Sequence, residues 1–68
     1  MKIYIPYYDR GWHIQEADAD RARRIGRFWL YNSVIYGDTA YNTEAASQAY
    51  IDKQYNKARL EEYKPLFA

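Results

Sequence analysis

The fold that we expect starts from the N-terminal segment, residues 2–17, which reads KIYIPYYDRGWHIQEA. Its side chains alternate between the two sides of an extended chain, which places Ile3 and Ile5 on one face of a strand. Residues 9–11, Asp-Arg-Gly, are typical of a tight turn, and the alternation resumes at Trp12. The segment therefore predicts an antiparallel β-hairpin.

Pro6 limits where the first strand of this hairpin can lie. A proline has no backbone N–H and cannot donate to the hydrogen-bonded ladder of a sheet. We therefore expect this strand at the edge of its sheet, or with the side of the strand at Pro6 left unpaired.

The next segment, residues 18–30, carries the spacing of a helix. Asp18 or Asp20 would cap it, because a carboxylate at the N-terminus accepts backbone N–H groups and lies at the positive end of the helix dipole. Small and apolar residues follow at helical intervals, namely Ala19, Ala22, Ile25 and Trp29. We predict a first helix from residue 18 to about residue 30.

The part of the chain after this helix allows two interpretations. Residues 32–33, Asn-Ser, favour a break, because both side chains compete for backbone hydrogen bonds. Residues 37–38, Gly-Asp, resemble a two-residue turn, so we favour a short hairpin that pairs residues 33–36 with residues 39–42. The rival interpretation is a single helix over residues 18–36.

Residues 43–63 predict a long second helix. Thr43 is a candidate N-cap, no glycine or proline interrupts the segment, and Pro65 is expected to end the helix. Two stripes of small and apolar side chains run along it, which predicts two packing partners. The stripes are Ser47, Ile51, Tyr55 and Ala58, and Ala45, Ala49, Leu60 and Tyr63.

Together these elements predict an α+β fold in one domain, residues 1–68. We expect an N-terminal antiparallel hairpin, or small sheet, packed against two α-helices, of which the C-terminal one is long. The apolar tail at residues 66–68 is expected to dock on the core or on a partner.

The composition excludes several classes of function. The 68 residues include no cysteine, which removes disulfides, thiolate nucleophiles and cysteine-ligated zinc, and His13 is the one histidine. Ten Lys and Arg against nine Asp and Glu give a net charge of +1, which is typical of neither a strongly basic nucleic-acid binder nor an acidic DNA mimic. No apolar run approaches the roughly 18 residues of a membrane span, and the N-terminus lacks the apolar stretch of a secretory signal. We therefore expect no metal, no cofactor, no membrane association and a cytoplasmic location.

Catalysis is not indicated either. His13 lies out of phase with Trp12 in the predicted strand, so it is expected on the solvent side. Nothing in the sequence brings it to Ser33 or Ser47, and a nucleophile needs a positioned base. We expect no catalytic residue and a non-enzymatic function.

Aromatic residues are unusually abundant, at 19%, and nine of them are tyrosines. So small a chain cannot bury them all, and exposed Tyr, Trp and Arg side chains are typical of binding hot spots. The predicted contact residues for a protein partner are Tyr7, Tyr8, Arg10, Trp12, Arg23, Arg24 and Arg27, with Tyr50, Tyr55 and Tyr63 on the second helix. Tyr8 and Trp12 flank the turn and should meet across the hairpin. The partner is expected to be another protein or protein complex, or a second copy of the chain.

An arginine face on the first helix supplies an alternative function. Arg21, Arg24 and Arg27 recur at three-residue intervals, with Arg23 beside them. Arginine suits bidentate contact with phosphate, and nearby aromatic rings could stack on bases. The alternative is therefore a small nucleic-acid-binding regulator.

Residues 36–52, which read YGDTAYNTEAASQAYID, resemble a pattern found in small phage and mobile-element proteins. In that pattern a strand ends at an aromatic residue, a threonine caps a helix, and the helix carries an isoleucine into the core. The chain is also similar in size, α+β pattern and tyrosine content to phage-encoded inhibitors of bacterial defence, such as anti-CRISPR proteins. The resemblance implies a protein that binds a host defence protein or complex in the host cytoplasm and blocks it. It implies no catalytic residue.

Overall fold

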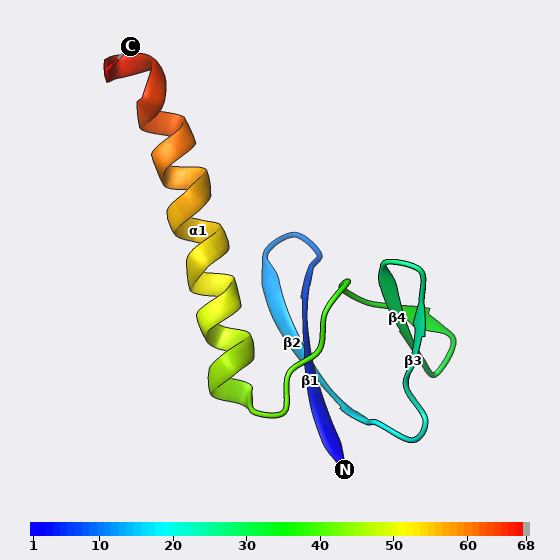
Figure 1. Ribbon diagram of the computed structural model, residues 1–68. Helices are drawn as coiled ribbons and strands as arrows, with labels where there is room; N and C mark the ends of the chain where they lie inside the picture. The colour runs from blue at the N-terminus through cyan, green and yellow to red at the C-terminus, as the bar shows by residue number, and fades with distance from the viewer. Residues whose placement is uncertain (68) are drawn as a thin grey trace.

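The computed structural model describes the backbone of residues 1–67 and the side chains of residues 1–60. Its elements are β1 (Lys2–Tyr8), β2 (Trp12–Asp18), β3 (Arg23–Ile25), β4 (Phe28–Tyr31), β5 (Val34–Ile35) and α1 (Glu44–Phe67). The strands form two antiparallel sheets, β1-β2 and β3-β4-β5. Figure 1 shows the β1-β2 hairpin between α1 on one side and the second sheet on the other.

The N-terminal hairpin is confirmed. Its register pairs Lys2 with Asp18 at the open end and Tyr8 with Trp12 beside the loop. The loop turns within three residues, because Arg10 and Gly11 both adopt positive φ values, of 57° and 138°. The N–H of Asp9 donates to the carbonyl oxygen of Gly11 across this loop, at 2.9 Å.

The two faces of the hairpin pack against different layers. Ile3, Ile5 and Ala17 share one face and form a buried cluster with Ala22, against which aromatic side chains of the second sheet pack. The opposite face carries Trp12, whose ring contacts Tyr50 of α1. The hairpin is thus covered on both sides, which explains why its strands carry apolar residues at odd and at even positions.

The outer edge of β1 is closed at Tyr4. The N–H of Tyr4 donates to the carbonyl oxygen of Tyr41 at 2.8 Å, and the N–H of Tyr41 donates back to Tyr4 at 2.9 Å. The fully buried Ser47 hydroxyl donates to the same Tyr4 carbonyl oxygen at 2.7 Å. Since backbone groups alternate sides along a strand, Pro6 directs its missing N–H to this edge and away from β2. The prediction that the Pro6 side of the strand does not pair in a ladder is confirmed.

The first predicted helix, residues 18–30, is wrong, and with it the fold class of two helices against a hairpin. Asp18 does cap a turn: its side chain accepts the N–H of Asp20 at 3.0 Å, and its carbonyl oxygen accepts the N–H groups of Arg21 and Ala22. That single turn does not propagate, and β3 begins at Arg23. Within the described residues the structure has one helix and five strands.

Two tight turns explain why this segment forms strands. Gly26 has a φ of 56° at the first position of the β3–β4 turn, and the next turn has Asn32 at 49° and Ser33 at 62°. Positive φ at both central residues defines a type I′ hairpin turn, and a single positive φ at the first is typical of type II′. Between the turns lies the aromatic run Phe28–Tyr31, which suits a pleated strand. The helix over residues 18–36 is therefore also wrong.

The predicted pairing of residues 33–36 with residues 39–42 is wrong as well, because β5 pairs with β4. Beyond β5, Trp29 donates its N–H to the carbonyl oxygen of Gly37 at 2.9 Å and accepts the N–H of Tyr36 at 2.8 Å. Tyr36 and Gly37 thus both lie opposite Trp29, as in a β-bulge. A Cβ atom on Gly37 would overlap the carbonyl oxygen of Pro6. Glycine here lets the second sheet approach the backbone of β1.

The C-terminal helix is confirmed, and so is its cap, since the Thr43 hydroxyl accepts the N–H of Ala46 at 3.2 Å. Pro65 does not end the helix, which continues to Phe67. Ser47 and Ile51 of the first stripe are buried, whereas Leu60 of the second is 71% exposed. Figure 1 shows α1 extending past the hairpin loop with no other element beside its far end. The predictions for Tyr63 and for residues 66–68 concern side chains outside those described.

Replacing Ser33 with glycine tests the second turn. We expect a gain of about 0.5 kcal/mol in the free energy of unfolding, because a left-handed conformation costs an L-residue roughly 1–2 kcal/mol and glycine's greater freedom when unfolded offsets part of that. Urea denaturation measures it, with Ser33→Ala as the control that should not stabilise. A helix over these residues would instead lose stability, since glycine has the lower helix propensity.

Replacing Gly37 with alanine tests the contact between the second sheet and β1. The added methyl group meets backbone at Pro6, so we expect a loss of about 2 kcal/mol or more by urea denaturation. Gly26→Asn is the matched control, because no atom lies within 4 Å of a Cβ at Gly26 and asparagine tolerates positive φ. Equal, small effects of the two changes would contradict the close approach.

Candidate functional site

A groove of about 640 Å³ opens where the hairpin loop, the first turns of α1 and the β4–β5 hairpin converge. We call it the aromatic groove. Its aromatic lining residues are Tyr7, Tyr8, Trp12, Phe28, Tyr36 and Tyr50. Pro6 and Gly37, whose backbones touch, connect the two sides. The groove therefore draws its lining from the N-terminal hairpin, from residues 27–38 in the middle of the chain and from Tyr50 of α1.

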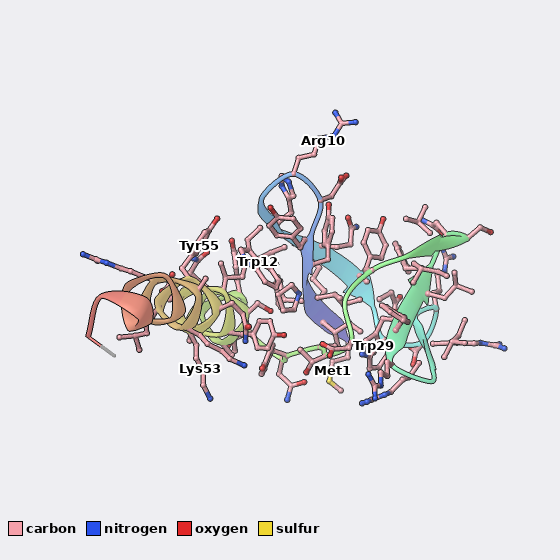
Figure 2. The ribbon with its side chains drawn as sticks, turned by 90° about the horizontal axis from the view of Figure 1, so that it is seen from above. Met1, Arg10, Trp12, Trp29, Lys53 and Tyr55 are labelled. Atoms are coloured by element: carbon pink, nitrogen blue, oxygen red, sulfur yellow. The ribbon has the colours of Figure 1, made fainter. Side chains whose placement is uncertain are left out.

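Ring contacts hold the aromatic side chains in place. The Trp12 ring packs edge-on between Tyr8 and Tyr50, with centroid distances of 5.7 Å to each. On the other face of the hairpin, Tyr7 and Tyr36 make a third edge-to-face contact, with their ring centroids 4.9 Å apart. In Figure 2 the Trp12 side chain lies between the hairpin and α1. Such pairs contribute about 0.5–1.5 kcal/mol each beyond their buried area, so the rings are already ordered without a ligand.

The groove also exposes apolar surface. Tyr8 is 68% exposed, Ile35 60% and Phe28 51%, and Val34 beside them is half exposed. No tyrosine among residues 1–60 is fully buried, as the aromatic content predicts. Contiguous apolar surface of this kind marks interaction sites more often than isolated exposed residues do.

The charged lining residues are two carboxylates and one guanidinium, Asp9, Asp38 and Arg27. The lining therefore carries a formal charge of −1 at neutral pH. Burial raises the pKa of the Tyr50 hydroxyl above its ordinary value of 10.0, and the charges of Asp38 and Tyr41 raise it further. Tyr50 thus stays a neutral hydrogen-bond donor at physiological pH.

The structure brings together five of the ten residues predicted for a protein partner: Tyr7, Tyr8, Trp12, Arg27 and Tyr50 line the groove. The predicted contact of Tyr8 with Trp12 across the hairpin is confirmed. Arg10 lies at the tip of the loop and points away from the body of the molecule (Figure 2). Arg23 and Arg24 lie on β3, outside the groove lining.

Sequence reasoning missed the second wall of the groove. The predicted helix over residues 18–30 includes Phe28, and the predicted contact residues do not include Val34, Ile35, Tyr36 or Asp38. The spacing of two turn dipeptides, at residues 26–27 and 32–33, was the signal that could have found this wall.

The predicted arginine face does not exist, because its helix does not form. Arg23 pairs with Leu30 and Arg24 with Trp29, so these two neighbours point to opposite sides of the second sheet. Arg24 donates its Nε–H to the carbonyl oxygen of Gly26 at 3.1 Å, and Arg27 lies in the groove. With Arg21 in the turn before β3, the four arginines do not form one row along a helix.

No catalytic pair assembles around His13 within the described residues. His13 is exposed, as predicted, and donates from Nε2 to the carbonyl oxygen of Asp9 at 3.0 Å. Ser47 is engaged with Tyr4 on the helix side of the hairpin. Among the described residues, no three His, Asp or Glu side chains gather in an arrangement that could hold a metal ion.

Comparison with known proteins gives no relative: no family model, no curated protein and no solved structure matches this chain. Over the residues that the structure describes, no helix combines the length and the apolar character needed to cross a membrane.

Replacing Tyr50 with phenylalanine tests the electrostatics of the groove. Because the folded pKa of Tyr50 is raised, the group stabilises the fold below the unfolded pKa of 10.0, and this stability is lost as the pH rises through the folded pKa. The wild type should therefore lose stability above pH 10 more steeply than Tyr50→Phe in urea titrations. Tyr55→Phe, on the same helix, controls for the loss of a hydroxyl. Parallel curves for the wild type and Tyr50→Phe would contradict the assignment.

Proposed function

We propose that this chain is a non-enzymatic protein-binding module whose contact surface is the aromatic groove. The observation that carries the proposal is the gathering of ordered aromatic rings and exposed aliphatic side chains in one concave surface. Trp, Tyr and Arg dominate binding hot spots, because they offer large contact area together with a polar tip. Trp12, Tyr8 and Arg27 supply all three in the groove.

The charge of the groove favours a protein over a nucleic acid. Phosphate backbones are bound by clustered Lys and Arg, and each contact releases counterions. The lining has two carboxylates against the single guanidinium of Arg27, so it would repel a polyanion. The four arginines considered for nucleic acid also do not share one face.

The partner is proposed to be a heterologous protein or protein complex. A phage-type inhibitor that blocks a host defence protein is the particular form that the resemblance of residues 36–52 implies, with the host cytoplasm as its location. Neither the fold nor the comparisons bear on that form, and it stays a hypothesis. A second copy of the chain is the competing partner, and mass measurements at two concentrations distinguish the two.

Two matched pairs of substitutions test the groove. Tyr8→Ala with Ile35→Ala removes one exposed tyrosine and one exposed aliphatic residue from the groove. Tyr55→Ala with Leu60→Ala removes the same residue types, similarly exposed, from α1. With tagged protein in bacterial lysate, we expect the groove pair to weaken capture of its partner roughly tenfold or more, and the α1 pair to leave it unchanged.

Circular dichroism and urea denaturation of both variants ensure that folding is intact. Capture that depends on the α1 pair and not on the groove pair would place the contact surface on the helix and refute the proposal. A concentration-dependent dimer that the groove pair dissolves would show that the groove serves self-association instead.

A further inference from the structure

The aromatic groove presents hydrogen-bond donors that its own chain does not use. Within residues 1–60, the hydroxyls of Tyr8, Tyr36 and Tyr50 and the indole N–H of Trp12 donate no hydrogen bond to another residue. These donors lie on rings that pack edge-on against one another. A ligand that suits the groove therefore offers apolar surface and unpaired acceptors together.

A strand added to β1 is not such a ligand here. The edge of β1 is closed at Tyr4 by Tyr41, Pro6 has no N–H, and the Pro6 carbonyl oxygen lies under Gly37. Strand addition depends on a run of free backbone donors and acceptors along an edge. Side chains, and not the backbone of β1, must make the contacts.

A helical peptide is not favoured either. In a helix the carbonyl oxygens are already bonded within the segment, so the donors of Tyr8, Trp12 and Tyr50 would be covered without partners. Each donor left unsatisfied in this way weakens binding. A polyproline II segment has the opposite character, since it forms no internal hydrogen bonds and all its carbonyl oxygens are free.

The charge of the lining adds a further requirement. Asp9 lies in the hairpin loop and Asp38 lies near Tyr50, and Arg27 is the one cation among the groove residues. A basic residue in the ligand would pair with the carboxylates, whereas an acidic one would meet the net charge of −1.

We propose that the aromatic groove binds an extended, proline-rich segment of a partner protein that carries an arginine or lysine next to the prolines. The pyrrolidine rings pack against the aromatic rings, the segment's carbonyl oxygens accept hydrogen bonds from the tyrosine and tryptophan donors, and the basic residue pairs with Asp9 or Asp38. This rests on the proposed function, in which the groove is the contact surface, and it specifies the chemistry of the partner.

Calorimetry with the full chain tests this ligand chemistry. The probe is a proline-rich peptide of about ten residues, some 30 Å long as polyproline II, with one arginine near an end. We expect it to bind, and to shift the indole N–H resonance of Trp12 in nuclear magnetic resonance spectra. Exchanging its arginine for glutamate should weaken binding about fivefold, and an alanine-rich peptide of equal charge should bind at least tenfold more weakly.

Conservative variants of the protein localise the effect. Tyr8→Phe keeps the ring and removes one donor, and it should weaken the peptide about fivefold, whereas Tyr55→Phe on α1 should not. Asp9→Asn with Asp38→Asn should remove the preference for arginine over glutamate while retaining affinity for proline. A proline peptide that does not bind, that binds all variants equally, or that binds no better than the alanine peptide would overturn the inference.

The two proposals fail in different ways. If the proline peptide does not bind but Tyr8→Ala with Ile35→Ala still abolishes capture from lysate, the ligand chemistry is wrong and the groove remains the contact surface. If that pair leaves capture intact, the proposed function itself fails.

Discussion

The carbonyl oxygen of Tyr4 is where the N-terminal hairpin is joined to α1 and to the segment before it. It accepts the N–H of Tyr41 at 2.9 Å and the buried hydroxyl of Ser47 at 2.7 Å, while the N–H of Tyr4 donates to Tyr41 at 2.8 Å. Each such bond contributes only about 0.5–1.5 kcal/mol to the free energy of unfolding. Their importance is positional, because they tie β1, the segment before α1 and the start of α1 to one residue, Tyr4. A helix that contacts the hairpin through so few turns depends on this point for its orientation.

The groove is a consequence of that junction. The chain leaves β5, passes over Pro6 at Gly37 and reaches Tyr4 at Tyr41, so it follows the outer edge of β1. This path sets Tyr36 against Tyr7, while α1 sets Tyr50 against Trp12. The two ring contacts lie on opposite faces of the β1-β2 hairpin, and the space between the hairpin loop and the β4–β5 hairpin stays open. The concave surface thus results from backbone packing at a glycine and not from a loop that happens to be long.

The placement of the aromatic residues follows from the size of the chain. The buried cluster consists of aliphatic side chains, Ile3, Ile5, Ala17 and Ala22, and rings such as Trp29 and Tyr31 lie at its margin, partly exposed. A chain of 68 residues has too little interior to enclose 19% aromatic residues. Some of the rings therefore pack against the core and others remain exposed. A larger domain could bury more of them, whereas this small fold keeps an aromatic surface.

Signals that act over a few residues were sufficient to predict several local elements. Alternation and the turn at residues 9–11 define the first hairpin, Pro6 its unpaired side, and Thr43 the start of α1. The contact of Tyr8 with Trp12 followed from the hairpin alone.

The helix predicted for residues 18–30 is wrong, as is its rival over residues 18–36, because alanines and apolar residues at helical spacing, from Ala19 to Trp29, also fit strands that turn at residues 26–27 and 32–33. Tertiary structure decides between the helix and the strands in this segment. The strands of the second sheet gain a covered inner face only by packing Trp29 and Tyr31 on Ile3 and Ile5. The groove could not be predicted from the sequence for the same reason. Its lining residues lie far apart along the chain, and the packing of Gly37 on Pro6 and of Ser47 on Tyr4 brings them together.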